Sequence, residues 1–453
     1  MKSESNYFIH NAFVVNELEV FCADVLVQNG RIAKICKNCN PVADVQSGND
    51  AVFIDATGKY LLPGVIDAHV HFREPGLTYK GDLFSESRAA AAGGVTSVMD
   101  MPNVIPPTTT VERCKERLRL AKKNMFTNYS FYLGASDNNL DELKKIDRTI
   151  CGIKLFMGAS TGNLLVEKEA ALEDIFRLKN IPIAVHCEDG HIIKSNMQQA
   201  KRAYGEHIPI EQHAEIRSEE ACFLSTQKAV ALAQKYGTQL HVLHLSTAKE
   251  LELFSQSYPK ITAEACVSYL CLDKTDYQRL GTRMKCNPSI KNASDREALL
   301  QAVISGKIAS IASDHAPHTA EEKNNPYSLA PSGLPMAAHI LPLMLEFCHE
   351  KKLSIETLVE RMCHAPAQIF NVKERGFIKE GFFADLVLVD LNTETKIEPE
   401  TIYYKCGWSP FEGKILHSRI EKTFVNGELA YDNGQFTHSP QGMPLEFVRE
   451  NVK

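Results

Sequence analysis

Residues 61–76, which read LLPGVIDAHVHFREPG, decide the fold. The stretch opens as an apolar run with β-branched residues, which is typical of a buried strand. It closes with His69 and His71. Alternate residues of a strand face the same side, so both imidazoles point one way with Cα atoms roughly 6.6 Å apart. Two neutral imidazoles at this separation can bind one metal ion, although two satisfied core histidines would give the same pattern.

Length and composition indicate a globular protein of more than one domain. The chain has 453 residues, of which 44% are hydrophobic and 23% charged, and its net charge is −6. This balance gives no reason to expect nucleic acid or an anionic membrane as a partner. A run of about 18 apolar residues is absent, and so is a basic-then-apolar leader, so we expect a cytoplasmic protein without a membrane segment.

The cysteines favour a reducing compartment. There are 13 of them, scattered without a framework. An odd number without regular spacing predicts free thiols. The one CxxC pair, Cys36 with Cys39, has no second pair to complete a zinc site, so we expect loop cysteines without a role.

The middle of the chain alternates between strand-like and helix-like segments. Apolar strand-like runs occupy 62–70, 95–101, 127–135, 151–157, 182–187, 239–245, 261–267 and 308–313. Helical patterns lie between most of them, including 219–236 and a segment that Ser294 and Glu297 would cap. Eight strands with helical crossovers predict an α/β fold, a (β/α)8 TIM-like barrel. A doubly wound sheet is the alternative, weakened by the lack of a Gly-rich first turn.

Both ends of the chain are rich in short strands. Asn29-Gly30 separates two strand patterns near the start, and Asn426-Gly427 does the same near the end. Such dipeptides predict β-hairpins. We therefore expect a small β-sandwich domain formed by both termini, 1–60 plus 378–453, around a barrel domain of 61–377 that is catalytic and metal-dependent.

Metal-competent side chains stand where five of the predicted barrel strands end. Because barrel enzymes place their chemistry at the C-terminal ends of strands, these side chains are expected at one height. They are His69, His71, Lys154, His186, His244 and Asp314.

Lys154 is the unusual member of this set, because an ammonium group would repel a divalent metal. A buried lysine loses its proton readily, and the neutral amine can add carbon dioxide to give an anionic carbamate that bridges two metals. Taken alone, Lys154 paired with a barrel carboxylate would be the simpler interpretation. Together with four histidines and an aspartate, the carbamate is favoured.

Two metals in an open site predict hydrolysis. They would lower the pKa of a bridging water to give hydroxide at neutral pH, and Asp314 would pass its proton to a leaving nitrogen as general base and acid. His318 lies on the loop beyond Asp314, where it can reach a substrate. We expect His241 to face away from the metals, as a packing residue or a support for the ligands, and His191, His207 and His213 to be surface residues. Amides, ureas, lactones and phosphoesters all remain open as substrates at this point.

The chain resembles the dihydroorotases of the amidohydrolase superfamily nearly from end to end. The resemblance rests on HVHFREPG (69–76), MPN (101–103), GIKL (152–155), SDHAPHTAEEK (313–323) and WSPFEG (408–413). It implies reversible conversion of L-dihydroorotate to N-carbamoyl-L-aspartate in pyrimidine biosynthesis. It also implies two zinc ions bridged by carboxylated Lys154, with His69, His71 and Asp314 on one and His186 and His244 on the other.

The resemblance also implies a set of substrate contacts. Arg73, Asn103 and His318 match positions that hold the substrate carboxylate, and Asn287 and the backbone at Gly333 match positions near the ring. The chain departs from the family pattern at 267–269 and at 334–338, which lie near the expected ring edge. Family members often pair, so a homodimer is expected.

Two alternatives stay open. A hydantoinase, dihydropyrimidinase or allantoinase would share the metals and the lysine, but a neutral ring would not need Arg73, Asn103 and His318 together. A non-catalytic scaffold for aspartate transcarbamoylase is the other, but such chains typically lose metal ligands, whereas all six candidate ligands are present here.

Overall fold

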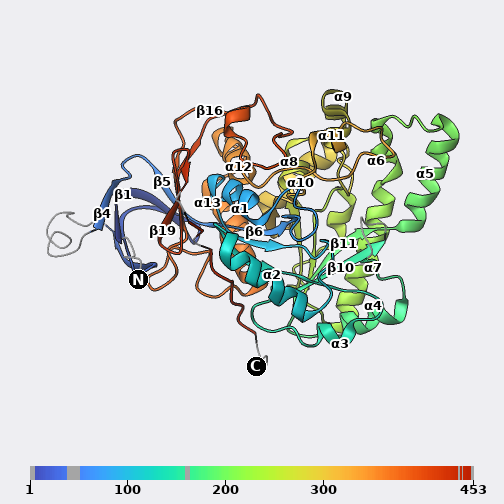
Figure 1. Ribbon diagram of the computed structural model, residues 1–453, viewed down its shortest axis with the longest axis horizontal. Helices are drawn as coiled ribbons and strands as arrows, with labels where there is room; N and C mark the ends of the chain where they lie inside the picture. Colours follow the sequence, from blue (N-terminus) through green and yellow to red (C-terminus); the bar gives the residue numbers. More distant parts are fainter. Residues whose placement is uncertain (1–5, 38–50, 159–163, 437–438, 441, 450–453) are drawn as a thin grey trace.

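The computed structural model describes residues 6–37, 51–158, 164–436, 439–440 and 442–449. Figure 1 shows a strand-rich region, with β1 and β4, at one end of the molecule and a helix-covered barrel filling the rest. None of the helices in the described ranges is long and apolar enough to cross a membrane.

The eight predicted barrel strands are present. They are β6 (Val65–Val70), β7 (Val95–Asp100), β8 (Asn128–Phe131) continued by β9 (Leu133–Gly134), β10 (Ile153–Gly158), β11 (Ile183–Glu188), β12 (Leu240–Val242), β13 (Ile261–Cys266) and β14 (Ser310–Ala312). Neighbouring strands pair in parallel from β6 to β8 and from β9 to β14. A parallel bridge between Val70 and His315 joins the last strand to the first. The predicted barrel fold is therefore confirmed.

Helices cover the outside of the barrel. They are α1 (Leu83–Ala92), α2 (Val111–Asn124), α3 (Leu140–Leu143), α4 (Glu169–Phe176), α5 (Gly190–Tyr204), α6 (His213–Ile216), α7 (Glu219–Tyr236), α8 (Val267–Cys271), α9 (Tyr277–Leu280), α10 (Ala293–Ser305), α11 (Ala320–Lys323), α12 (Ile340–His349), α13 (Ile355–Val359) and α14 (Ala365–Phe370). α7 has the predicted bounds because Ser218 caps its start and Gly237, with a left-handed backbone, ends it.

The predicted capping box of α10 is wrong. Ser294 and Glu297 lie inside the helix, which begins at Ala293 with Asn292 as its cap. Asp295 at the third helical position accepts a hydrogen bond from the Asn292 backbone at 3.1 Å. Both pairs have cap-forming side chains three residues apart, and the pair that starts two residues earlier caps the helix.

The strands of both termini form one nine-stranded sheet. In order, it contains β20 (Gln435–Phe436), β19 (Glu428–Asp432), β18 (Arg419–Val425), β15 (Leu386–Asp390), β5 (Tyr60–Pro63), β1 (Asn6–Asn16), β2 (Glu19–Gln28) and β3 (Arg31–Lys37), with β4 (Ala51–Asp55) also on β1. β1 pairs with β4 through its first half and with β5 through its second, so the sheet divides there. A separate pair, β16 (Thr395–Lys396) with β17 (Ile415–Leu416), lies outside this sheet.

The two predicted hairpin turns pack against each other. Asn29 and Gly30 both have positive φ, as do Asn426 and Gly427. Glycine is required at the second position of each turn because a Cβ on Gly30 would lie 2.8 Å from the Asn426 carbonyl oxygen, and one on Gly427 would lie 2.5 Å from Gly30 Cα. The contact ties the N-terminal strands to the C-terminal ones.

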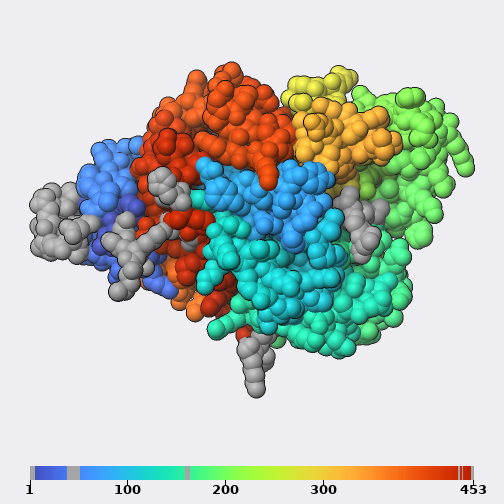
Figure 2. Space-filling model, in the orientation of Figure 1, coloured from blue at the N-terminus to red at the C-terminus, as the bar shows by residue number. Residues whose placement is uncertain are grey.

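Much of the C-terminal part of the chain packs on the barrel. Figure 2 shows it, in orange and red, between the N-terminal strands and the barrel. Tyr404, Trp408 and Phe411 belong to the same apolar core as the barrel strands. The last described residues return to the barrel as well, where Arg449 donates to the Cys151 carbonyl oxygen at 3.0 Å. This segment thus extends the barrel core beyond the range 61–377.

The prediction of free thiols fails at one position. The described cysteines other than Cys36 are free. Cys36 is disulfide-bonded, and it lies in β3 opposite Asp24 rather than in a loop. Cys39, the other member of the CxxC pair, lies outside the described residues.

Candidate active site

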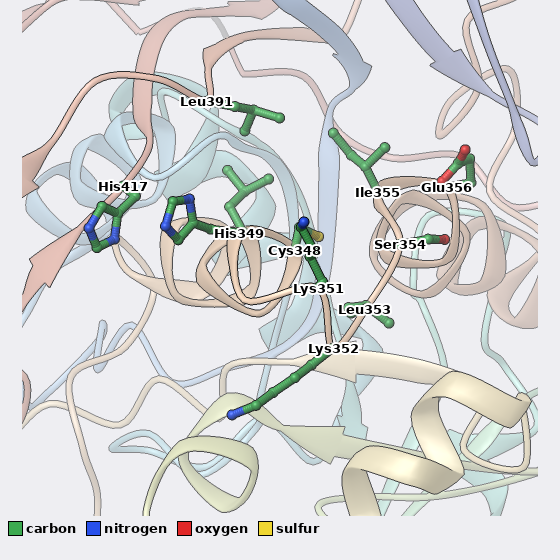
Figure 3. A pocket seen from close by; sticks show the side chains of 11 residues that line it. Cys348, His349, Lys351, Lys352, Leu353, Ser354, Ile355, Glu356, Leu391 and His417 are labelled. Atoms are coloured by element: carbon green, nitrogen blue, oxygen red, sulfur yellow. The ribbon is translucent and has the colours of Figure 1, made fainter.

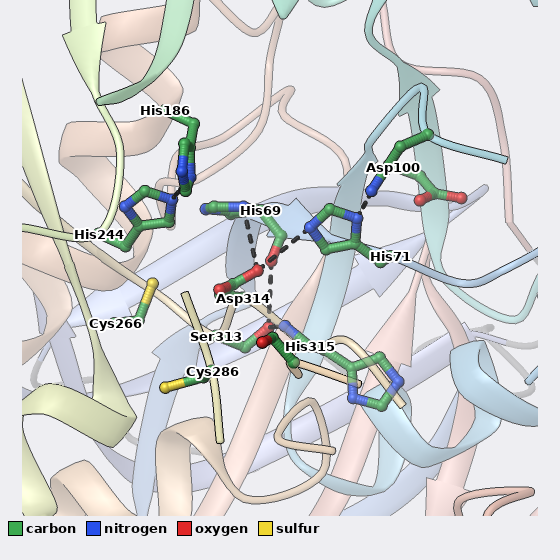
Figure 4. Close-up of polar contacts among 12 residues, drawn as sticks. His69, His71, Asp100, His186, His244, Cys266, Cys286, Ser313, Asp314 and His315 are labelled. Carbon is green, nitrogen blue, oxygen red and sulfur yellow. Dashed lines mark hydrogen bonds and ion pairs between the residues drawn. The ribbon is translucent and has the colours of Figure 1, made fainter. Parts of the chain in front are cut away.

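Three predicted ligands meet where the first and last barrel strands end. His69 lies in β6, His71 follows it, and Asp314 lies two residues beyond β14. Asp314 Oδ1 is 3.2 Å from His69 Nε2 and 3.1 Å from His71 Nε2, as Figure 4 shows. Closure of the barrel therefore brings together residues that are about 240 positions apart in the sequence.

The other nitrogen of each imidazole is held by an oxygen. His69 Nδ1 lies 2.5 Å from Glu264 Oε1, and His71 Nδ1 lies 2.7 Å from Asn103 Oδ1. These oxygens only accept hydrogen bonds, so the ring hydrogens are on Nδ1. The Nε2 lone pairs of His69 and His71 then face the Asp314 carboxylate. Lone pairs and a carboxylate repel one another unless a cation lies among them. This donor set therefore fits a metal ion.

The protonation states of His71 and Asp314 are compatible with a bound metal ion. Burial lowers the pKa of His71 to about 4, which keeps the ring neutral at pH 7. Burial raises the pKa of Asp314, but His69 and His71 oppose this effect, and the net pKa lies well below the usual carboxyl range. A neutral imidazole and an ionised carboxylate are the forms that bind metals.

His186 and His244 form a second donor pair. His186 Nδ1 is 2.9 Å from His244 Nε2, and His186 Nε2 is 3.1 Å from the Glu188 carboxylate. Glu188 thus accepts a hydrogen bond from His186 Nε2–H. The lone pair of His186 Nδ1 is then directed at His244. His244 Nδ1 is buried without a hydrogen-bond partner. Two imidazole nitrogens facing each other inside a protein also fit a bound cation.

Lys154 lies between these groups on β10. Its side chain is 1% exposed, and burial lowers its pKa to about 8. Its amine makes neither a hydrogen bond nor an ion pair within the ranges that the structure describes, and it lies over the Phe156 ring, 4.7 Å from the centroid. The structural alternative, a lysine paired with a barrel carboxylate, is therefore not found here. Asp314 and Glu264 lie near enough to oppose the lowering of its pKa, but neither pairs with the amine, and burial remains the larger effect.

The backbone is strained where the strands deliver these residues. His244 has φ 39°, Asp314 has φ 47°, and Arg73 has φ 69°. A left-handed conformation in a residue other than glycine costs energy and concentrates at functional sites. In each case the chain turns directly after a strand or a strand extension, which directs the side chain into the mouth of the barrel.

Arg73 supplies positive charge beside the metal donors. Its side chain is 6% exposed, and its Nε donates to the Pro317 carbonyl oxygen at 3.0 Å. It forms no ion pair with a carboxylate among the described residues. Burial lowers its pKa to about 10, so it stays charged at pH 7. A buried guanidinium without a counter-ion is suited to binding an anionic ligand.

One cavity joins these groups. Asn287 contributes a buried Oδ1 that has no hydrogen-bond partner. Gly333 has φ 145°, and a Cβ there would lie 2.4 Å from the Ala316 carbonyl oxygen. The lining contains every predicted site residue except His318: His69, His71, Arg73, Asn103, Lys154, Phe156, His186, His244, Asn287, Asp314, Ala316, Ser332 and Gly333.

His318 lies behind Arg73 rather than on the cavity wall. Its Nε2 is 3.0 Å from Arg73 Nη2 and 3.0 Å from the Ser332 carbonyl oxygen. Sequence position alone placed it near the substrate, but the loop after Asp314 turns its ring toward Arg73.

Sequence reasoning missed the carboxylates that hold the ligands. Glu264 accepts from His69 and also contacts His241 Nε2 at 3.3 Å. His241 therefore points into the barrel and supports the ligand side through Glu264, so the prediction that it faces away from the metals is wrong. Glu188 contacts His186 and Arg217. The available signal was a glutamate inside or at the end of an apolar strand, because a charged residue in a buried strand needs a partner.

The prediction that His213 is a surface residue is wrong. His213 is 1% exposed, and its ring contacts the Tyr327 hydroxyl at 2.9 Å and the Cys286 carbonyl oxygen at 2.7 Å. Its polar neighbours in the sequence suggested solvent, but α6 packs inward. His191 and His207 are exposed, as predicted.

A second hollow lies away from this site, between α12, the start of α13 and the residues near His417 (Figure 3). His349 and His417 stack there with ring centroids 4.1 Å apart. In the part of the chain that the structure describes, the groups of three donors close enough to share a metal ion all include His69. The hollow near His417 is therefore not a comparable metal site.

Comparison with known proteins identifies the family. A family model described as the amidohydrolase family matches residues 60–430, so the chain belongs to the amidohydrolase family. It is 32% identical over 406 residues to a dihydroorotase of Methanosarcina acetivorans, covering 86% of this chain and 85% of that one. It is 29% identical to an allantoinase of Desulfitobacterium hafniense, covering 98% and 99%.

Solved structures of related enzymes have the same fold as this chain. L-hydantoinase (dihydropyrimidinase) from Arthrobacter aurescens superposes with a TM-score of 0.91 at 28% identity, covering 97% of this chain and 99% of that one. The chain is a hydrolase that acts on cyclic amide bonds. Members of this family generally bind metal ions, in keeping with the donor set of His69, His71 and Asp314.

Proposed function

We propose that the protein is a dihydroorotase, which interconverts L-dihydroorotate and N-carbamoyl-L-aspartate in pyrimidine biosynthesis. The observation that carries the proposal is Arg73, a buried guanidinium without a carboxylate partner among the described residues, on the wall of the cavity that holds the metal donors. L-Dihydroorotate differs from the neutral rings of related substrates by its carboxylate. A buried cation next to the reacting ring would bind that group and would have no counterpart on a neutral ring.

The donor sets support two metal ions, for which we propose zinc. His69, His71 and Asp314 would hold one ion, His186 and His244 would hold the other, and carboxylated Lys154 would bridge them. When bound, the metals would act as Lewis acids on the ring carbonyl and lower the pKa of a water molecule. Glu264, Asn103 and Glu188 fix which nitrogen of His69, His71 and His186 is offered.

Asp314 is the proposed general base and acid. It is ionised at neutral pH and therefore begins the cycle able to accept a proton. It would take the proton of the attacking water and give it to the ring nitrogen as the C–N bond breaks. In ring closure the same carboxylate would act in the reverse order.

The remaining polar groups of the cavity are proposed to position the ring. Arg73 and Asn103 would bind the carboxylate from the cavity wall, and His318, which lies behind Arg73, would bind it through the Nε2 that faces Arg73 and Ser332. Asn287 and the backbone at Gly333 would face the ring, and the unpartnered Asn287 Oδ1 can accept a hydrogen bond from a ring N–H. Relatives named dihydroorotase, at about 30% identity over most of the chain, support this assignment.

A hydantoinase, dihydropyrimidinase or allantoinase activity is the second candidate. It is favoured by the L-hydantoinase structure with a TM-score of 0.91 and by the allantoinase relative. These proteins share the fold, so the substrate must be decided by the cavity wall. The buried charge of Arg73 favours an anionic substrate over a neutral ring.

The test is ring opening by metal-loaded protein on L-dihydroorotate, dihydrouracil, hydantoin and allantoin at equal concentrations. We expect turnover of dihydroorotate and a kcat/KM at least about 10²-fold lower for each of the other rings. Preference for a neutral ring would support the second candidate. Inactivity on all four, with bound metal verified, would favour the scaffold for aspartate transcarbamoylase.

Three further features belong to the same proposal. We propose a homodimer, a cytoplasmic location, and a division into the barrel of 61–377 and the terminal β-sandwich domain of 1–60 plus 378–453, with the first boundary inside β5 and part of the C-terminal segment packed on the barrel. Sedimentation of the purified protein tests the first, and limited proteolysis near the two proposed boundaries tests the third.

A further inference from the structure

Both ring nitrogens of His318 are occupied. Its Nδ1 lies 2.9 Å from Lys80 Nζ. Its Nε2 lies 3.0 Å from Arg73 Nη2 and 3.0 Å from the Ser332 carbonyl oxygen. A single imidazole thus stands between two cationic side chains, and its hydrogen position depends on which of them donates to it.

Lys80 is buried and forms an ion pair beside its contact with His318. It is 8% exposed, and its ammonium group also lies 2.9 Å from Glu322 Oε1. Glu322 is fixed in turn, because its backbone and carboxylate form the capping box of α11 with Thr319. Burial lowers the pKa of Lys80, but the ion pair with Glu322 opposes this shift and favours the ammonium form, which only donates hydrogen bonds. His318 Nδ1 must therefore accept, which leaves the ring hydrogen on Nε2.

The neutral form of His318 follows from its surroundings. Burial, with the cationic Arg73, Lys80 and Lys323 nearby, lowers the pKa of His318 well below its usual value. Glu322 Oε2, the carboxylate oxygen nearest to Nδ1, is 3.6 Å away, beyond a hydrogen bond. A doubly protonated ring is therefore disfavoured, and the Nε2–H form remains.

In the Nε2–H form of His318, two hydrogen-bond donors, His318 Nε2 and Arg73 Nη2, lie next to each other. His318 Nε2–H donates to the Ser332 carbonyl oxygen, while Arg73 Nη2 approaches the same nitrogen as a second donor. The Ser332 carbonyl oxygen accepts the His318 hydrogen, whereas the Arg73 Nη2 donor that faces Nε2 has no acceptor among the described residues. An anionic oxygen beside Arg73 Nη2 would accept from the guanidinium and share the His318 Nε2–H with the Ser332 carbonyl oxygen; Arg73 and Ser332 both line the cavity.

We propose that Lys80 is a specificity-determining positioning residue, which holds His318 in the Nε2–H form so that His318 and Arg73 together bind the carboxylate of the substrate. The inference rests on the proposed function and deepens it. Lys80 does not line the cavity and acts only through His318. Without Lys80, the ring can move its hydrogen to Nδ1, and Nε2 then accepts from Arg73 and offers nothing to the carboxylate.

The kinetic test compares Lys80→Met with Lys80→Arg in the metal-loaded protein. Lys80→Met should raise KM for L-dihydroorotate about tenfold and leave kcat within about twofold, because a lost charge-assisted contact to a ground-state group weakens binding. Lys80→Arg, which also only donates, should restore KM to within about threefold of wild type. Equal KM values in wild type and Lys80→Met would overturn the proposal.

Tyr79→Phe is the matched control. The Tyr79 hydroxyl donates to the same Glu322 oxygen at 3.0 Å, but the side chain is 56% exposed and does not contact His318. We expect KM for L-dihydroorotate to stay at the wild-type value. A tenfold rise in this variant would mean that the Glu322 environment in general, rather than the His318 hydrogen, sets KM, and would count against Lys80.

Nitrogen-15 NMR of labelled histidine separates this inference from the proposed function. Wild type should show His318 with a protonated Nε2 and an unprotonated Nδ1, and Lys80→Met should shift that pattern toward Nδ1–H. Nδ1–H in wild type, or an unchanged pattern in Lys80→Met, would contradict the role of Lys80 whatever the substrate. If wild type opens only neutral rings, the proposed function and the carboxylate half of this inference both fail.

Discussion

The two ends of the cavity differ in how their charges are balanced. At the metal end, His69 and His186 each contact a buried carboxylate, and lone pairs converge on one another. At the other end, Arg73 and His318 present donors without a carboxylate partner within hydrogen-bonding distance among the described residues. The first end is therefore suited to binding a cation and the second to binding an anion. We therefore propose that the chemistry common to the family takes place at the first end and that the second end selects the substrate.

The largest expected effect comes from Lys154→Ala, which tests the metal end. The variant should lose the second metal and about 10³-fold in kcat/KM, roughly 4 kcal/mol, because the bridging anion is gone. Metal analysis and the ring-opening assay measure both, and a short carboxylic acid should restore part of the activity. Lys291→Met, at a buried lysine outside the cavity, is the control and should keep its metal. Full activity and metal content in Lys154→Ala without added acid would disprove the carbamate.

Arg73→Met tests the other end. We expect kcat/KM for L-dihydroorotate to fall about 10²-fold, near 3 kcal/mol, because the carboxylate loses a buried charged partner. Activity on dihydrouracil should stay within about threefold, and the metal content should not change. A parallel loss on both rings would place Arg73 in the catalytic step and erase the distinction between the two ends.

The pH dependence of stability tests whether His213, which lies behind the cavity wall at Asn287, is buried in its neutral form. Burial lowers its pKa from 6.5 to about 3. The unfolded state therefore binds more protons between these values, and the free energy of unfolding falls as the pH falls below 6.5. At pH 5 the free energy of unfolding is lower than at neutral pH by about 2 kcal/mol because of His213. Denaturant unfolding at pH 7 and pH 5 should show that His213→Asn loses about 2 kcal/mol less than wild type. Equal losses would contradict a buried neutral His213.

Glu264→Gln gives the smallest expected effect. An amide can still accept from His69 Nδ1, but without the negative charge, so metal affinity should weaken about tenfold. Competition with a chelator measures this affinity. Glu250→Gln, at a buried carboxylate that contacts Thr226 and Thr247, should leave metal affinity unchanged. Equal affinities in Glu264→Gln and wild type would mean that the carboxylate does not tune His69.

Local patterns predicted most of the scaffold. Apolar runs gave the barrel strands because a parallel strand is buried on both faces, and the residues that end them, such as His69 and His186, follow from the barrel rule. Features that depend on tertiary contacts were missed. The sequence around His213 is polar, yet α6 turns it inward, and Lys80 meets His318 although 238 residues separate them. No local pattern encodes such a pair.

The structure of the metal-loaded protein with bound L-dihydroorotate would test the central claim most directly. The account predicts the ring against the metal ligands and the substrate carboxylate in contact with Arg73 and with His318 Nε2. A carboxylate that points to solvent, or one that binds the metals while Arg73 stays unpartnered, would contradict it.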